Sequence, residues 1–116
     1  MKTIKIAFDI DGTIRDNTAD QLKAPVANEE IRSLLIILSK FKNVEIIVWS
    51  GGGELYARQV CASLGLDKYV DKYASKETSP EDGWGVHGHS TIKPDIAIDD
   101  IHHCELGAIN LIVKQK

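Results

Sequence analysis

The chain has 116 residues, 43% of them hydrophobic, which suits one globular domain over 1–116 with a single packed core. Its formal net charge of −3 excludes a general electrostatic attraction to acidic lipid or nucleic acid, so nucleic acid stays open as a partner without support. No stretch approaches the roughly 20 consecutive apolar residues that cross a bilayer, and we expect no membrane association.

The amino terminus and the two cysteines indicate a reducing compartment. Residues 1–12 (MKTIKIAFDIDG) alternate apolar residues with Lys and Asp and lack the continuous apolar stretch of a signal peptide. Cys61 and Cys104 are far apart and form no CxxC motif, so both are expected to be small buried hydrophobic residues. We therefore expect a cytoplasmic protein, and homo-oligomer formation is left open.

The first half of the chain predicts alternating strands and helices. Residues 3–8 have the alternation of a strand, which ends at the polar stretch 9–13 (DIDGT). A helix is expected over 29–42, because apolar residues recur at helical spacing and Asn28 suits its N-cap. Residues 44–49 are apolar and rich in β-branched side chains, which is typical of a parallel strand covered on both faces.

The second half continues the alternation. Alternation of this kind indicates an α/β fold with a doubly wound, Rossmann-like, mostly parallel sheet and helices on both faces. In such sheets ligands bind at the carboxyl ends of the strands. The expected elements are a glycine turn over 50–53, a helix over 54–64 with Gly65 as its left-handed end, strands over 69–73, 96–98 and 109–113, an irregular loop over 74–93 and a short helix or turn over 102–106.

Four acidic residues follow two of the predicted strands: Asp9 and Asp11 after the first, and Asp99 and Asp100 after 96–98. Each pair alone has an ordinary explanation, because Asp is common in turns and at helix N-caps. Together at one sheet edge, however, four carboxylates repel one another unless a cation is bound. Oxygen ligands of this kind suit Mg²⁺.

Two further features suit an anionic ligand. Ser50 and Gly51 lie between a buried strand and a helix, where free backbone N–H groups and the helix dipole attract anions. A flexible turn that needs glycine explains the same residues. Lys93, which precedes the strand at 96–98, is by itself an ordinary surface lysine.

Taken in order, these motifs resemble the four motifs of the haloacid dehalogenase (HAD) superfamily. The resemblance rests on Asp9-Ile-Asp-Gly-Thr, the apolar strand ending in Ser50, Lys93-Pro94 and the apolar strand followed by Asp99-Asp100, and it spans nearly the whole chain. It implies a Rossmann-like sheet with the strand order 5-4-1-2-3. It also implies a Mg²⁺-dependent phosphatase that acts on a phosphorylated substrate.

The resemblance also implies a role for each residue. Asp9 is the nucleophile that forms an aspartyl-phosphate, and Asp11 is the general acid and base. Since dehalogenases of the superfamily lack this second acid, Asp11 favours phosphate chemistry. Asp9, the backbone carbonyl of Asp11 and Asp99 hold Mg²⁺, with Asp100 in support. The phosphoryl oxygens are bound by Thr13, Ser50, Gly51 and Lys93.

No cap domain is expected, because 15–27 has room only for a short flap and 65–93 only for a short strand and a loop. An uncapped site admits small or macromolecular phosphate esters, and a polynucleotide 3′-phosphatase-like activity stays open. Trp84, His87 and His89 in the long loop are candidates for a substrate rim, although a polar loop with one anchoring aromatic residue explains them as well.

Two other functions stay open. A receiver-like phosphoacceptor domain uses the same residue types, but its phosphorylated Asp ends a middle strand, where this chain has Ser50. A catalytically silent binding module on the same fold is the second alternative, and the complete set of acids argues against it.

Overall fold

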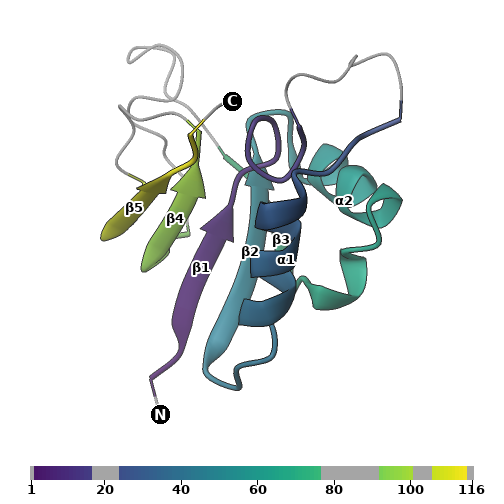
Figure 1. Cartoon of the computed structure of the whole chain (residues 1–116). Helices are drawn as coiled ribbons and strands as arrows, with labels where there is room; N and C mark the ends of the chain where they lie inside the picture. The colour runs from purple at the N-terminus through teal and green to yellow at the C-terminus, as the bar shows by residue number, and fades with distance from the viewer. Residues whose placement is uncertain (1, 17–23, 77–91, 101–105, 115–116) are drawn as a thin grey trace, which may run out of the picture.

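The structure, a computed structural model, describes residues 2–16, 24–76, 92–100 and 106–114 and contains a five-stranded sheet whose strands are all parallel (Figure 1). This confirms the predicted α/β class. The elements are the strands β1 (Ile4–Phe8), β2 (Val44–Ser50), β3 (Lys72–Ser75), β4 (Ile96–Asp99) and β5 (Ile109–Ile112), the helices α1 (Glu29–Leu38) and α2 (Glu54–Ser63), and the 3₁₀ turn η1 (Asp67–Tyr69).

The sheet has the strand order β3-β2-β1-β4-β5, which is the order that the family resemblance implies. From β1 the chain proceeds through β2 to β3 at one edge, and it then returns to β4 on the other side of β1. The strand order therefore reverses between β1 and β4, which is where open α/β sheets bind their ligands. The carboxyl ends of these two strands are brought together by this topology.

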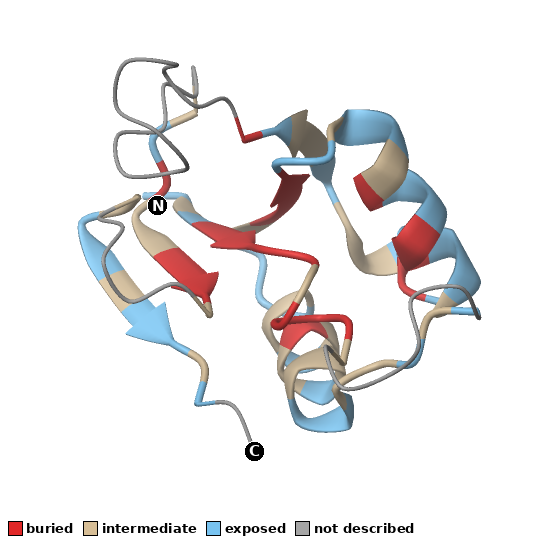
Figure 2. Ribbon diagram, turned by 90° about the horizontal axis from the view of Figure 1, so that it is seen from above, coloured by how far each residue is buried: buried red, intermediate tan, exposed pale blue. Residues whose placement is uncertain are grey.

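Both described helices lie on the same face of the sheet (Figure 2). Leu35 of α1 and Val60 of α2 pack in one cluster with β1 and β2. The opposite face carries a smaller cluster around Trp49. Helices on both faces were expected, but the connections 77–91 and 101–105, which include most of the predicted loop and turn, lie outside the described residues.

Helix α1 ends at Leu38, four residues before the predicted boundary. The backbone N–H groups of Lys40 and Phe41 donate to the carbonyls of Ile37 and Leu38, three residues earlier, so the last turn tightens into a 3₁₀ geometry. The apolar spacing continues to Phe41, but this side chain is 55% exposed and adds little packing. Among the described residues, no helix is long and apolar enough to span a membrane.

Helix α2 ends as predicted. Gly65 has φ +71°, and its N–H donates to Ala62 O while Leu66 N–H donates to Cys61 O, the two bonds of a Schellman motif. Leu66 is fully buried. Cys61 is buried as expected, and burial raises the pKa of its thiol to about 12, whereas Cys104 lies outside the described residues.

Strand β3 begins three residues later than predicted. Residues Asp67–Tyr69 form η1 instead, and Asp71 aligns the next segment, because its carboxylate accepts a 2.8 Å hydrogen bond from Ile46 N. The strand therefore extends to Ser75, which pairs with Ser50 at the end of β2. As a result, Lys76 emerges at the carboxyl edge of the sheet.

Candidate active site

The loop after β1 folds into a tight, buried turn. The N–H groups of Thr13 and Arg15 both donate to Ile10 O, at 3.2 and 2.9 Å, and Gly12 adopts φ +81°. Ile10 and Ile14 are fully buried, so they anchor the loop in the core. This packing fixes the polar residues between them at the carboxyl end of β1.

Three aspartates meet at the point where the strand order reverses. One carboxylate oxygen from each of Asp9, Asp99 and Asp100 lies within 4.8 Å of the other two. Asp9 follows β1, and its N–H donates a 3.0 Å hydrogen bond to Ile98 O of β4, which joins the two strand ends. Asp9 and Asp99 are buried, and Asp100 is half-buried. We call these three residues the acidic cluster.

Gly12 gives the acidic cluster its close packing. A Cβ atom at Gly12 would overlap Asp100 Oδ2 and would lie 2.7 Å from Asp100 Cγ. Only glycine therefore lets the β1 loop approach the carboxylate this closely, and only glycine adopts this φ without strain. The two acidic motifs, about 90 residues apart in the chain, are thus fitted against each other.

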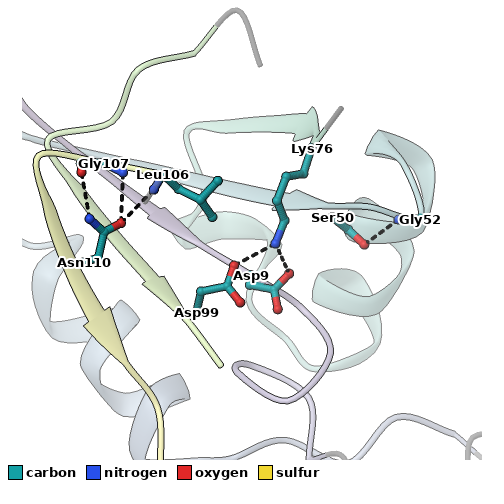
Figure 3. A network of polar contacts seen from close by, with 8 residues as sticks. All are labelled: Asp9, Ser50, Gly52, Lys76, Asp99, Leu106, Gly107 and Asn110. Atoms are coloured by element: carbon teal, nitrogen blue, oxygen red, sulfur yellow. Dashed lines mark hydrogen bonds and ion pairs between the residues drawn. The ribbon is translucent and has the colours of Figure 1, made fainter. Parts of the chain in front are cut away.

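Lys76 reaches into the acidic cluster from the end of β3, as Figure 3 shows. Its Nζ donates to Asp9 Oδ1 at 3.1 Å and to Asp99 Oδ2 at 2.7 Å. Its side chain is only 6% exposed, so it is a buried counter-ion and not a surface charge. Buried ammonium groups are stable only when paired in this way.

Burial and neighbouring charges shift the pKa values of the acidic cluster and of Lys76. Burial raises the pKa of Asp9 to about 7, Lys76 opposes this rise and Asp99 adds to it. Burial and the neighbouring Asp99 also raise the pKa of Asp100. Although burial opposes it, the charges of Asp9 and Asp99 raise the pKa of Lys76. Among the described residues, these three carboxylates contact one ammonium group, that of Lys76, so full ionisation of these four groups would leave two negative charges.

This donor set fits a magnesium ion. The ligand atoms are carboxylate oxygens, which Mg²⁺ prefers, and they converge from two adjacent strand ends. A divalent cation would balance the two negative charges that remain on the described groups when all of them are ionised. It would also favour the ionised forms of Asp9 and Asp100, whose protons otherwise relieve the repulsion.

Asp11 is not a member of the acidic cluster. Its Oδ1 accepts a 2.7 Å hydrogen bond from Tyr56 Oη and lies 3.5 Å from Arg15 Nη1. The side chain of Asp11 is 45% exposed, in contrast to Asp9. The resemblance to the HAD superfamily implies that the backbone carbonyl of Asp11 contacts the metal, and its half-exposed carboxyl group would then be accessible to a substrate or to water.

Three of the four predicted anion-binding residues lie at the carboxyl edge of the sheet. Ser50 is buried at the end of β2, and its Oγ accepts a 3.0 Å hydrogen bond from Gly52 N. Gly51 is exposed at the tip of this turn. Thr13 is fully buried, and among the described residues its Oγ1 has no hydrogen-bond partner. A hydroxyl group left in this state is suited to a ligand oxygen.

The lysine that contacts the aspartates is Lys76, whereas Lys93, which the sequence analysis selected, is exposed. Lys76 was placed within an irregular loop because the third strand was predicted to end at residue 73. The topology could have indicated Lys76. The carboxyl ends of all the parallel strands lie at one edge of the sheet, so the residue that follows the third strand lies at this edge as well.

Some predicted contributors lie outside the described residues. These are Trp84, His87 and His89, proposed for the substrate rim, and most of the flap expected over 15–27.

No protein-family model matches the chain, and no curated protein or solved structure does either.

Proposed function

We propose that this protein is a cytoplasmic, Mg²⁺-dependent phosphomonoester hydrolase of the capless HAD type, doubly wound and using Asp9 as a covalent nucleophile. One observation carries the proposal: Asp9, Asp99, Asp100 and the buried Lys76 converge where the strand order reverses. Buried carboxylates with raised pKa values are costly for folding, and such groups concentrate at functional sites.

The metal belongs to the acidic cluster in this proposal. Asp9, Asp99 and Asp100 would hold the ion, together with the backbone carbonyl of Asp11. When bound, Mg²⁺ neutralises and orients the phosphoryl group during transfer. The protein's own contribution is to hold the carboxylates in place, while the Lys76 ammonium group favours the ionised form of Asp9.

Two displacements at phosphorus complete the reaction. A carboxylate oxygen of Asp9 forms a bond to phosphorus while the ester oxygen departs and takes the proton of Asp11. Water then attacks phosphorus and gives its proton to Asp11, and the bond to Asp9 breaks. Inorganic phosphate is released, and both carboxyl groups return to their initial states.

Lys76, Thr13 and Ser50 supply the groups that hold the phosphoryl oxygens. The Lys76 ammonium group already contacts Asp9, so it lies beside the position of the transferring phosphorus. The Thr13 hydroxyl group lies on the loop after β1, and the Ser50 hydroxyl group lies at the end of the neighbouring strand β2. Positive charge and hydrogen-bond donors fixed in advance stabilise the charge of the transition state.

The strand order argues against the receiver-like alternative. In receiver-type sheets, which have the order 2-1-3-4-5, the third strand lies next to the first. Here β4 takes that position and β3 is the edge strand beyond β2. The residue at the end of β3 is also followed by Lys76 and not by an aspartate.

Hydrolysis of p-nitrophenyl phosphate with and without Mg²⁺ tests the proposal, with Asp9→Asn measured beside the unchanged protein. We expect phosphate release that requires both the metal and Asp9, since the amide cannot attack phosphorus. Equal activity in the two proteins, or no activity in the folded, Mg²⁺-loaded unchanged protein, would contradict it. Phosphorylated sugars, peptides and 3′-phosphorylated oligonucleotides then separate the substrate classes.

A further inference from the structure

Asp11, the proposed acid, belongs to a second polar cluster, and the other two members of this cluster, Tyr56 and Arg15, have no part in the mechanism above. Tyr56 Oη donates a 2.7 Å hydrogen bond to Asp11 Oδ1, and Arg15 Nη1 donates a 3.0 Å hydrogen bond to Tyr56 Oη. Arg15 Nη1 also lies 3.5 Å from Asp11 Oδ1. Tyr56 Oη, Arg15 Nη1 and Asp11 Oδ1 therefore form a triangle in which each atom contacts the other two.

The chemistry of the three groups fixes the direction of each hydrogen bond. A guanidinium group can only donate, so the Tyr56 oxygen accepts from Arg15 and directs its own proton to Asp11. Burial and the hydrogen bond to Asp11 raise the pKa of Tyr56, so its hydroxyl group stays protonated at neutral pH. Since both contacts fall on Oδ1, the other oxygen, Oδ2, is the one placed to carry a transferable proton.

The triangle also joins the two loops of the site. Arg15, whose side chain is 8% exposed, closes the β1 loop, because its carbonyl accepts from Gly12 N at 3.0 Å. Tyr56 is in the first turn of α2, with its ring against the preceding glycine turn: a Cβ at Gly52 would be 3.0 Å from Tyr56 Cδ2. One aromatic ring therefore sets the distance between the proposed phosphate-binding turn and the proposed acid.

We propose that Tyr56, oriented by Arg15, is a positioning residue that holds the Asp11 carboxyl group for proton transfer to the leaving oxygen. This inference rests on the proposed function. The proton leaves Asp11 Oδ2 for the ester oxygen as the bond from that oxygen to phosphorus breaks and the bond from Asp9 forms. In the second step a water proton returns to Oδ2 as the water oxygen attacks phosphorus.

Leaving groups of different basicity test the inference. A p-nitrophenolate departs without a proton, whereas an alkyl alcoholate needs one, and kcat/KM reports every step up to ester cleavage. For Tyr56→Phe we expect kcat/KM to fall about tenfold or more with an alkyl phosphate and less than about twofold with p-nitrophenyl phosphate. Asp11→Asn should show the same selectivity with a larger loss, and Arg15→Lys should resemble Tyr56→Phe.

Tyr73→Phe is the matched control, because Tyr73 Oη donates a hydrogen bond of the same 2.7 Å length to Asp67 away from the site. We expect it to leave the ratio of the two kcat/KM values unchanged. Equal losses on both esters in Tyr56→Phe, with Asp11→Asn selective, would overturn the positioning role alone. A nonselective Asp11→Asn, or an unchanged protein inactive on both esters, would overturn the proposed function as well.

Discussion

At the scale of single residues, the described part of the site holds more buried carboxylates than ammonium groups. Lys76 neutralises one of the three carboxylates of the acidic cluster. Burial raises the pKa of Asp9 and that of Asp100, and the neighbouring Asp99 carboxylate adds to both rises. We expect a divalent cation to bind here by replacing the protons of these two carboxyl groups, without a rearrangement of the fold.

Gly12→Ala tests the fit between the two acidic motifs. The new methyl group would overlap Asp100 and would hold φ +81° under strain. We expect a loss of stability above the roughly 1–2 kcal/mol of a non-glycine residue in the left-handed region. We also expect Mg²⁺ affinity to fall about tenfold or more in isothermal titration calorimetry, because a carboxylate beside the ion is displaced.

Gly65→Ala is the matched control for this substitution. Gly65 has a similar φ of +71°, but its nearest side-chain atom is Arg32 Nη2 at 3.7 Å, an ordinary contact distance. It should lose stability from backbone strain alone and keep its Mg²⁺ affinity. Equal Mg²⁺ affinities in the two variants would mean that Asp100 takes no part in binding the ion.

Several of these residues could be predicted from their order in the chain, and others could not. Asp9, Asp99 and Asp100 follow apolar strands, and the parallel topology brings such positions together whatever the details. Lys76 was missed because its burial depends on the register of β3, which a short and weakly patterned strand does not reveal. The partners of Asp11 depend on the packing of α2, which the sequence does not specify.

At the scale of elements, helix α2 begins without a side-chain cap of its own. Its N-cap residue is Gly53, at φ +103°, and the hydroxyl group of Ser75 accepts from Glu54 N at 3.1 Å instead. The cap is thus supplied by β3, which ties the helix start to the strand that carries Lys76. The glycine turn stays open in front of the helix, where we expect phosphate to bind.

Ser75→Ala should therefore lower the free energy of unfolding, because it removes the hydroxyl group that caps α2. Loss of a hydroxyl cap costs roughly 0.5–2 kcal/mol, which urea denaturation can measure. Ser33→Ala, at an exposed position inside α1, should cause no loss, because alanine is the better helix former. A free energy of unfolding that is the same for Ser75→Ala and the unchanged protein would show that the interstrand cap contributes nothing.

The regular elements were mostly predictable, and their ends were not. The alternation in β1 and the largely apolar sequences of β2 and β4 are clear strand patterns, so these three strands lie within a residue of their predicted bounds. Helix α1 continues its apolar spacing beyond its end because periodicity does not report where backbone hydrogen bonds change partner. Strand β3 is displaced by η1, which has no apolar signature.

At the scale of the whole molecule, the fold gathers reactive carboxylates at one edge of the sheet, and their burial lowers the stability of the protein. The reversal of strand order places β1 beside β4, and three acids then share a space that a core would fill with apolar groups. Functional sites commonly carry such destabilising groups. The loss of stability caused by the acidic cluster should be measurable in the metal-free protein.

The stability of the metal-free protein should depend on pH in a defined direction. The folded pKa of Asp9, about 7, is above its unfolded value of 3.8, so the folded state holds a proton that the unfolded state has lost. The contribution of Asp9 to stability is therefore full below about pH 4, falls as pH rises, and reaches its minimum above about pH 7. The raised pKa of Asp100 acts in the same direction.

Thermal unfolding in EDTA at about pH 5 and about pH 8 measures this effect against Asp9→Asn, which cannot ionise. We expect the variant to gain stability relative to the unchanged protein at the higher pH. Added Mg²⁺ should reverse this gain, because the ion stabilises only the protein that binds it. A stability difference that is the same at both pH values would contradict the assignment of the raised pKa to Asp9.

The central claim, that Asp9 becomes phosphorylated during turnover, can be tested by trapping the intermediate. Borohydride added at the quench of a reaction with p-nitrophenyl phosphate and Mg²⁺ reduces an aspartyl-phosphate to homoserine, which peptide mass spectrometry locates. We predict that the modification maps to position 9, requires Mg²⁺ and is absent from Asp9→Asn. Turnover with no modification at this position, or with modification of another acid, would contradict the account.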